Sequence, residues 1–211
     1  MPKGFFVTGT DTNLGKTVVS ATLCAALDAT YWKPIQTGTR EGADRVTVMR
    51  IAERPRARTI AEVYKFAPAV SPHLAARLAG VRIDLRKIDP PRINESEMLI
   101  AEGAGGVLVP INEKQLMIDL MVRLKLPVLL VARTTLGTIN HTLLSLAVLR
   151  SARLDVHGVI MVGKPNADNR KAIERYGKVK VFGVLPRLAK LNRRALVKAF
   201  RANFKQSDFV L

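Results

Sequence analysis

Cysteine and long apolar runs are both scarce in this 211-residue chain. Cys24 is the only cysteine in the sequence, so no disulfide can form within the chain. No stretch approaches the roughly 18–20 apolar residues that a membrane-spanning helix needs. The apolar run near the N-terminus is too short for the core of a signal peptide. We therefore expect a cytoplasmic protein with a reduced thiol and no membrane partner.

Acidic residues are also scarce. The sequence has 34 Lys and Arg but only 17 Asp and Glu, which gives a net charge of +17. Residues 164–205 alone hold 13 basic residues and two acidic ones. Such a charge permits binding to nucleic acid or to an anionic membrane without requiring it. Aromatic residues in this segment are too few and too irregularly spaced for a platform on which bases stack. We interpret the charge as solvated helix faces and expect no nucleic-acid partner.

The overall amino-acid composition is ordinary for a folded chain with a sizeable core. Hydrophobic residues make up 48% of the sequence and charged residues 24%, a balance that argues against global disorder. The sequence contains no internal repeat, no low-complexity segment and nothing that resembles a domain linker. We predict a single domain over residues 1–211.

Short apolar runs alternate with longer amphipathic segments along the chain. Strands are predicted over residues 5–8, 30–35, 62–66, 98–102, 127–132, 156–162 and 179–185. Helices are predicted over residues 16–28, 71–78, 117–124, 138–153, 168–176 and 193–204. This alternation indicates βαβ units, and hence an α/β fold with a mainly parallel sheet flanked by helices on both faces. Residues 82–97, which include Pro90 and Pro91, are predicted to be a connection.

The first strand runs directly into the sequence Gly-Thr-Asp-Thr-Asn-Leu-Gly-Lys-Thr at residues 9–17. A glycine-bounded turn between a strand and a helix, ending in Gly-Lys-Thr, is typical of a phosphate-binding P-loop. Lys16 would reach the β- and γ-phosphates, and Thr17 would ligate Mg²⁺. The two glycines enclose five residues rather than four, so Thr10 occupies the place where the first glycine is usual. A chance match is the alternative, but the strand–turn–helix context argues against it.

Three further blocks carry candidate ligand-binding groups. Lys33 ends the second strand, where parallel sheets open onto their ligand crevice, although it could also be an ordinary surface charge. Glu102 ends an apolar strand before a glycine-rich turn and suits a Mg²⁺ ligand; a purely structural turn is the alternative. Residues 134–141 begin a helix whose free N–H groups could bind a carboxylate, and Thr138 could simply cap that helix.

Taken together, these blocks resemble the dethiobiotin synthetase family. The matching pieces occur in the family's order, at residues 9–17, 33–38, 71–75, 102–106, 136–142 and 183–186. The resemblance implies a single-domain P-loop NTPase fold. It also implies an enzyme that converts 7,8-diaminopelargonate, CO₂ and MgATP to dethiobiotin, ADP and phosphate, in which the protein mainly positions groups and neutralises charge.

The family's catalytic roles can be carried onto matching positions of this chain. By resemblance, Lys16 stabilises charge on the transferred phosphoryl group, and Lys33 neutralises the carbamate near the γ-phosphate. Thr17, Asp44 and Glu102 would hold Mg²⁺, with Asp44 as the metal-binding acid that follows the second strand.

The resemblance also implies where the organic substrate binds. Thr37 would hydrogen-bond the diamine or its carbamate, and Thr10 and Asp11 would line the same pocket. Gly137, Thr138 and Asn140 would bind the carboxylate tail, in the family from the neighbouring subunit. The expected assembly is therefore a homodimer with shared sites. His73 and His141 lie in matching motifs, but we assign neither a chemical role and expect packed side chains.

The nucleotide site implied by the resemblance has two parts. The phosphates would bind to Asp11, Thr12, Asn13, Leu14, Gly15, Lys16 and Thr17. The base would lie near Val162, Gly163, Leu185 and Pro186. Many family members read adenine with an Asn where this chain has Val162 and Gly163, and Asn166 is out of register. We therefore predict a relaxed base preference, with ATP as the nucleotide substrate.

Three rival functions remain open from the sequence. A DNA- or scaffold-associated partition-type P-loop ATPase fits the basic C-terminal third, but such proteins usually carry a second lysine where this chain has Thr10 or Asp11. A related amidotransferase synthetase usually continues into a glutaminase domain with a cysteine nucleophile, whereas Cys24 is expected in the core. A non-enzymatic nucleotide-binding module would leave Lys33, Asp44 and Glu102 without a shared purpose.

Overall fold

A seven-stranded sheet forms the centre of the molecule. The computed structural model describes residues 2–210, apart from the side chain of Glu41. The strand order is β4-β2-β6-β1-β7-β8-β9, and every pairing within this sheet is parallel. The strands are β1 (Gly4–Gly9), β2 (Thr30–Trp32), β4 (Thr59–Ile60), β6 (Leu99–Gly106), β7 (Val128–Arg133), β8 (Val156–Val162) and β9 (Val181–Leu185). The predicted α/β class with a parallel sheet is confirmed.

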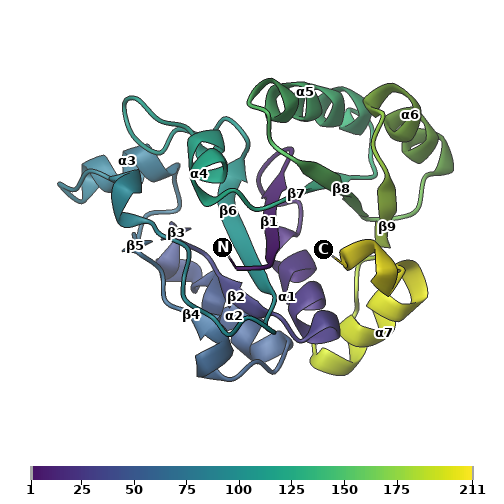
Figure 1. Cartoon of the computed structure of the whole chain (residues 1–211), viewed down its shortest axis with the longest axis horizontal. Coiled ribbons are helices and arrows are strands. Elements are labelled where there is room, and N and C mark those ends of the chain that lie inside the picture. Colours follow the sequence, from purple (N-terminus) through teal and green to yellow (C-terminus); the bar gives the residue numbers. More distant parts are fainter. Residues whose placement is uncertain (1, 211) are drawn as a thin grey trace.

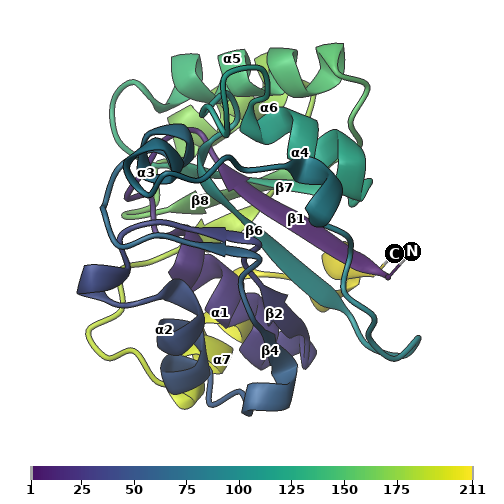
Figure 2. The ribbon, with the colours of Figure 1, turned by 90° about the vertical axis from the view of Figure 1, so that its left-hand side faces the viewer.

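Helices cover both faces of this sheet (Figures 1 and 2). One face carries α1 (Lys16–Leu27), α2 (Asp44–Ile51) and α7 (Arg193–Asn203). The opposite face carries α3 (Pro72–Leu78), α4 (Met117–Leu124), α5 (Thr138–Ser151) and α6 (Ala167–Gly177). The sheet draws strands from both ends of the chain, in keeping with one domain over residues 1–211, which stays a prediction.

Strand β1 shows why the core has two halves. Its side chains alternate between the two faces, because successive side chains of a strand point in opposite directions. Phe5 and Val7 pack with α1 and α7, whereas Phe6 packs with α3 and α4. All six residues of β1 are buried, as expected for a central parallel strand covered on both faces.

Local sequence determines where several helices begin. The side-chain oxygen of Asn166 accepts a hydrogen bond from the backbone N–H of Asn169 at 2.9 Å and caps α6. Asn192 caps α7 in the same way. The six predicted helices all form, each within two residues of its expected bounds. Residues 82–97 form the predicted connection, with a single 3₁₀ turn over Leu85–Lys87.

The predicted strand over residues 30–35 is wrong in its extent. The chain forms β2, then leaves the main sheet and forms β3 (Ile35–Gln36), which pairs with β5 (Tyr64–Lys65) in a separate sheet. Pro34 stands at the break, because it has no N–H to donate to a strand ladder. Its carbonyl accepts hydrogen bonds from the backbone of Val63 and Tyr64 instead.

Helix α2 and strand β4 are not predicted from the sequence. Helix α2 is short and mostly polar, and it buries only Val48 and Ile51, so it has little apolar periodicity to detect. Strand β4 contains two residues. The first residue of α2 is Asp44, so this missed helix carries one of the expected metal ligands.

The basic C-terminal third forms the exposed faces of α6 and α7. Arg193, Arg194, Lys198 and Arg201 are all exposed or half-buried on α7, which agrees with the interpretation as solvated helix faces. The helix's apolar side buries Leu196 and Phe200 against α1 and the sheet. Within residues 2–210, none of the helices has the length and apolar character to span a membrane.

Candidate active site

The P-loop connects the end of β1 to the start of α1. Gly15 has a φ of 88° and Asn13 a φ of 53°, a left-handed conformation that glycine and asparagine adopt most easily. A Cβ atom on Gly15 would lie 3.4 Å from the side chain of Val162, so the loop passes close to the end of β8. Since α1 begins at Lys16, its first N–H groups have no intrahelical partners and face the loop.

Lys16 is 8% exposed, and its ammonium group donates a hydrogen bond to the backbone carbonyl of Asp11 at 2.8 Å. Burial lowers the pKa of Lys16 to about 8, against the opposing effect of the nearby Glu102 carboxylate. Its amine therefore lies at the start of α1, partly desolvated and available to an anionic ligand.

Four polar side chains from separate parts of the chain meet beside the P-loop. The hydroxyl oxygen of Thr17 lies 3.0 Å from Asp44 Oδ1 and 3.0 Å from Glu102 Oε1. Lys33 forms an ion pair with Asp44 and another with Glu102, whose Oε1 lies 3.2 Å from Lys33 Nζ. The Glu102 side chain is fully buried and that of Asp44 is 28% exposed. These groups line a cavity of about 410 Å³ with Lys16.

Two further side chains position the residues that carry the carboxylates. Tyr31 donates its hydroxyl hydrogen to Glu102 Oε2 at 3.1 Å, inside the core. Gln36 Oε1 accepts the backbone N–H of Asp44 at 3.0 Å and so positions the start of α2. Sequence analysis missed both residues. The only signals for them are that Gln36 lies in the matching block at residues 33–38 and that Tyr31 lies in the strand predicted over residues 30–35.

The charges of this cluster stabilise one another. Burial alone would lower the pKa of Lys33, but the carboxylates of Glu102 and Asp44 outweigh burial and raise the pKa above its ordinary value. Burial likewise opposes ionisation of Asp44, yet the Lys33 ammonium lowers the pKa of that carboxyl below its ordinary value. Burial, followed by the charge of Glu102, raises the pKa of Tyr31. Lys33 and Asp44 are therefore charged and Tyr31 is protonated near neutral pH.

Glu102 does not end its strand as the sequence suggested. Strand β6 continues to Gly106, and Glu102 lies in its interior opposite Val7 of β1. The structure therefore buries a carboxylate within the sheet next to Thr17. Its partners within the described residues are a lysine, a threonine and a tyrosine.

The donor set fits a magnesium ion. A hydroxyl oxygen and two carboxylates gathered around one point are the hard oxygen ligands that Mg²⁺ prefers, and protein magnesium sites commonly use one or two carboxylates with phosphate oxygens. Thr17 brings Asp44 and Glu102 to within hydrogen-bond distance of one hydroxyl group. In the described part of the chain, no group of three or more His, Cys, Asp or Glu residues forms a metal site of another kind.

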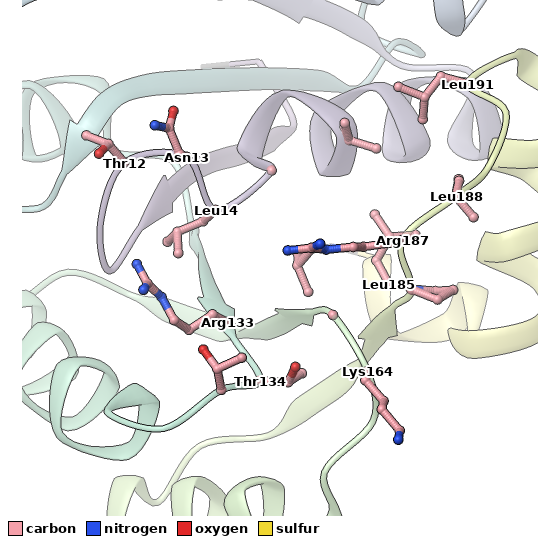
Figure 3. A pocket seen from close by; sticks show the side chains of 16 residues that line it. Thr12, Asn13, Leu14, Arg133, Thr134, Lys164, Leu185, Arg187, Leu188 and Leu191 are labelled. Atoms are coloured by element: carbon pink, nitrogen blue, oxygen red, sulfur yellow. The ribbon is translucent and has the colours of Figure 1, made fainter.

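A larger cavity of about 790 Å³ lies on the other side of the P-loop (Figure 3). Its walls include all four residues expected near the base: Val162, Gly163, Leu185 and Pro186. The residues expected at the phosphates also contribute, with Thr12, Asn13, Leu14 and Gly15 along one wall. The structure therefore brings the two predicted parts of the nucleotide site into one cavity.

This cavity also contains cationic side chains that the sequence did not single out. Arg187 extends its guanidinium group from the loop after β9 into the space facing the P-loop (Figure 3). Arg133, the last residue of β7, forms an ion pair with Asp11. Asn166 is not part of the lining, since it caps α6. The position of Arg133 immediately before the 134–141 block is a signal that could have identified it.

The expected substrate residues lie along two neighbouring cavities. Thr37 lines a cavity of about 700 Å³ that also includes Asp44 and Gly105. Thr10 and Asn140 line a separate cavity of about 420 Å³ with a mainly apolar wall formed by Val107, Val109 and Leu144, among others. Thr12 borders both of these cavities and the nucleotide cavity, so the P-loop lies between them.

The start of α5 is only partly available to a ligand within this chain. Gly137, with a φ of 91°, precedes the helix. The side chain of Thr138 is buried and donates to the carbonyl of Arg133 at 2.5 Å, so its hydroxyl group fixes the turn instead of capping α5. Neither Gly137 nor Thr138 lines the cavities described above. Asn140 is exposed and does line one.

The two histidines of the matching motifs differ in their surroundings. His73 is half-buried, with Nδ1 3.0 Å from the hydroxyl oxygen of Ser71, which agrees with a packed side chain. His141 is exposed and lines the same cavity as Asn140, so the expectation of a packed histidine is wrong there.

Comparison with known proteins gives close relatives over the full chain. A family model described as an AAA domain matches residues 3–195. The ATP-dependent dethiobiotin synthetase BioD of Rhodopseudomonas palustris (strain HaA2) is 46% identical over 210 residues, which cover 100% of this chain and 98% of that protein. The protein of the same name from Bradyrhizobium sp. (strain BTAi1 / ATCC BAA-1182) is 48% identical over 209 residues, covering 99% of both chains.

Similarity to solved structures extends to more distant proteins. The crystal structure of a ParA family ATPase from Chlorobium tepidum TLS aligns with a TM-score of 0.53, covering 95% of this chain and 92% of that chain. The sequence identity is 8%, so this likeness concerns the fold alone. The sequence relatives, in contrast, share close to half of their residues with this chain.

Proposed function

The chain belongs to the ATP-dependent dethiobiotin synthetase family, and on that premise we propose that it converts 7,8-diaminopelargonate, CO₂ and MgATP to dethiobiotin, ADP and phosphate. The observation that carries the proposal is the cluster of Thr17, Lys33, Asp44 and Glu102 beside the P-loop. A module that only binds nucleotide has no need for a buried lysine held between two carboxylates at this place.

The reaction needs positioning and charge neutralisation more than covalent chemistry. One amine of the substrate takes up CO₂ as a carbamate and loses a proton. A carbamate oxygen then attacks the γ-phosphorus, ADP leaves, and a carbamic–phosphoric anhydride results. The second amine attacks the carbamate carbon, closes the cyclic urea and expels phosphate.

Lys33 and Lys16 supply the positive charge for these steps. We propose that Lys33 neutralises the carbamate and approaches the γ-phosphate, because it lines the same cavity as Lys16 and Thr17. Lys16 lies at the N-terminus of α1 and would follow the transferred phosphoryl group. Lys16 must release the Asp11 carbonyl to do so, which costs a single hydrogen bond.

Thr17, Asp44 and Glu102 would hold Mg²⁺, which supplies Lewis-acid neutralisation of the phosphate charge when bound. Tyr31 orients the Glu102 carboxylate, and Gln36 holds the backbone of Asp44 at the start of α2. The Lys33 ammonium group pairs with both carboxylates and compensates their negative charges when no ligand is bound.

The remaining predicted residues would bind the two substrates. The P-loop, residues 11–17, would hold the phosphates of ATP, while Val162, Gly163, Leu185 and Pro186 would surround the base. Thr10 and Thr37 would contact the diamine. We propose that Gly137, Thr138 and Asn140 receive the carboxylate tail across the interface of a homodimer. The N–H groups of Ile139 and Asn140 have no backbone partner within the described residues, which supports anion binding there.

We further propose that base discrimination is weak. The side chains around the base cavity are mainly apolar or cationic, as Leu185, Leu188 and Arg187 exemplify. A cationic side chain donates hydrogen bonds and accepts none, so it cannot recognise the exocyclic amine of adenine. Similar kcat/KM values for ATP, GTP and CTP would support the proposal, and a preference for ATP of more than about a hundredfold would refute it. In V162N, an added amide at the cavity wall should shift preference toward ATP.

The test of the main proposal is turnover of the diamine. Purified protein is incubated with MgATP, bicarbonate and 7,8-diaminopelargonate, and phosphate release and dethiobiotin are followed by colorimetry and mass spectrometry. Lys33→Ala and Lys16→Ala should abolish product, whereas Lys3→Ala, which removes an exposed lysine, should leave it unchanged. Thermal melts confirm that each variant is folded.

ATP hydrolysis without a requirement for the diamine would refute the substrate assignment. The partition-type ATPase would then become the better hypothesis, and a DNA gel shift that strengthens with ATP and weakens with salt would test it. We propose no nucleic-acid partner and a cytoplasmic location. An absence of any gel shift at low salt agrees with the first, and cell fractionation tests the second.

A further inference from the structure

An ion pair crosses from the sheet to the P-loop through Arg133, a residue to which the proposed chemistry gives no role. Arg133, at the end of β7, places its Nη2 atom 2.5 Å from Asp11 Oδ2. The two residues are 122 positions apart in the sequence. Their side chains are 42% and 45% exposed, so such a pair contributes little to folding stability. Its position therefore calls for another explanation.

Asp11 makes hydrogen bonds through three different atoms near the start of the P-loop. Its Oδ1 accepts the backbone N–H of Thr12 at 2.7 Å. Its backbone carbonyl accepts the hydrogen bond from the Lys16 ammonium at 2.8 Å. Its Oδ2 binds Arg133. Whatever changes the pairing of this carboxylate therefore acts on the same loop that is expected to hold the nucleotide phosphates.

The ion pair also lies on the boundary between two cavities. Arg133 lines the nucleotide cavity together with Leu14 of the P-loop (Figure 3). Asp11 lines the neighbouring cavity that contains Thr10, Asn140 and the apolar wall of Leu144. One partner is thus exposed to the nucleotide side and the other to the proposed diamine side.

The hydrogen-bonding and charge properties of Arg133 and Asp11 match the ligands expected in the cavity that each one lines. A guanidinium group carries five N–H donors, and Asp11 is the one hydrogen-bond acceptor that Arg133 has among residues 2–210. Its planar fork of donors suits phosphate oxygens, which arginine binds in a bidentate manner, so a phosphate can take the place of the Asp11 carboxylate. A carboxylate released by Arg133 suits an ammonium group, the form that an aliphatic amine takes near neutral pH.

We propose that Arg133 is a positioning residue that couples the two sites through Asp11. Phosphate oxygens of the bound nucleotide compete with Asp11 for the guanidinium group, and the freed carboxylate then binds an ammonium group of the diamine. Nucleotide and diamine consequently bind with positive cooperativity. This inference rests on the proposed function, because the diamine is the ligand assigned to the second cavity.

Isothermal titration calorimetry of the full chain tests the coupling. The Kd of 7,8-diaminopelargonate is measured with and without a saturating, non-hydrolysable methylene analogue of ATP and Mg²⁺. In the wild type, the analogue should tighten diamine binding at least about fivefold, a typical size for such coupling. By reciprocity, the diamine should tighten binding of the analogue by the same factor.

The variants separate coupling from a merely structural role. In R133A the carboxylate is free from the start, so diamine binding without nucleotide should equal or exceed that of the wild type, and the coupling factor should fall to about one. In D11N diamine binding should be weak with or without the analogue. R133K keeps a cation and should retain part of the coupling.

Arg170→Ala is the matched control, because Arg170 forms a similarly exposed ion pair with Glu174 on α6. It should leave the coupling factor unchanged. A wild type that binds the diamine equally with and without the analogue would overturn the inference, and so would R133A with undiminished coupling. A wild type that does not bind the diamine at all would overturn the proposed function as well. A structural role alone would lower the melting temperature of R133A without changing the coupling factor.

Discussion

Removal of the Lys33 ammonium group should destabilise the protein far more than removal of an exposed lysine. Lys33 is 6% exposed and neutralises Glu102, whose side chain is fully buried, as well as Asp44. Lys33→Ala therefore leaves the buried Glu102 carboxylate and the partly exposed Asp44 carboxylate without the ammonium group that pairs with both. Breaking a buried ion pair in this way costs about 3–5 kcal/mol. For a chain of this size, that corresponds to a fall in Tm of roughly 6–20 °C.

The assay is urea unfolding at pH 7.5 with EDTA and no nucleotide, because a divalent cation would replace the missing charge. Wild type, Lys33→Ala and Lys3→Ala are compared, and the last should differ from wild type by less than about 0.5 kcal/mol. The double variant Lys33→Ala/Glu102→Gln should recover at least half of the lost stability. The amide that replaces the carboxylate keeps the shape of the side chain and still accepts the hydrogen bond from Tyr31, but it carries no charge.

Two results would refute this electrostatic reasoning. A loss of less than about 1 kcal/mol in Lys33→Ala would mean that water or rearrangement compensates the carboxylates. No recovery in the double variant would mean that Lys33 contributes through packing of its aliphatic chain instead of its charge. Addition of Mg²⁺ should stabilise Lys33→Ala more than wild type if the oxygen cluster binds the metal.

Three further outcomes are expected. Burial lowers the pKa of Lys16 to about 8 from 10.5, so the unliganded protein bears the cost of a buried charge below that pH. Urea unfolding should then show Lys16→Met to be more stable than wild type at pH 7 by up to roughly 3 kcal/mol. This difference in stability should shrink as the pH rises from 8 toward 10.5, and a difference that stays constant contradicts the reasoning. Burial raises the pKa of the Cys24 thiol. A disulfide reagent at pH 8 should therefore leave the native protein unmodified and react with one thiol per chain in concentrated urea. Rapid reaction with the native protein would argue against the packing of α1. Phe209 is 1% exposed and contacts the rings of Phe5 and Phe182. In the same unfolding assay, Phe209→Ala should lower the free energy of unfolding by about 3–5 kcal/mol. Val210→Ala, at a position that is 70% exposed, should be nearly neutral.

The amino-acid sequence by itself determined the features that depend on neighbouring residues. The P-loop could be located because phosphate binding uses contiguous backbone and the start of the next helix, so that Gly15, Lys16 and Thr17 suffice to indicate it. Strands β1, β6, β7, β8 and β9 were predictable because each is a short apolar run covered on both faces. Helices α6 and α7 are capped by Asn166 and Asn192, whose capping preference is local.

Tertiary structure alone decided which polar groups meet. Thr17 contacts Asp44 and Glu102 across 27 and 85 residues of chain, and no local pattern specifies such a distance. Pro34 removes Gln36 from the main sheet and lets its side chain position Asp44. The pairing of Arg133 with Asp11 depends on the adjacency of β1 and β7. Local propensities arise from neighbours in the chain, whereas a polar site in the core depends on the order of strands in the sheet, which is set by packing of the whole chain.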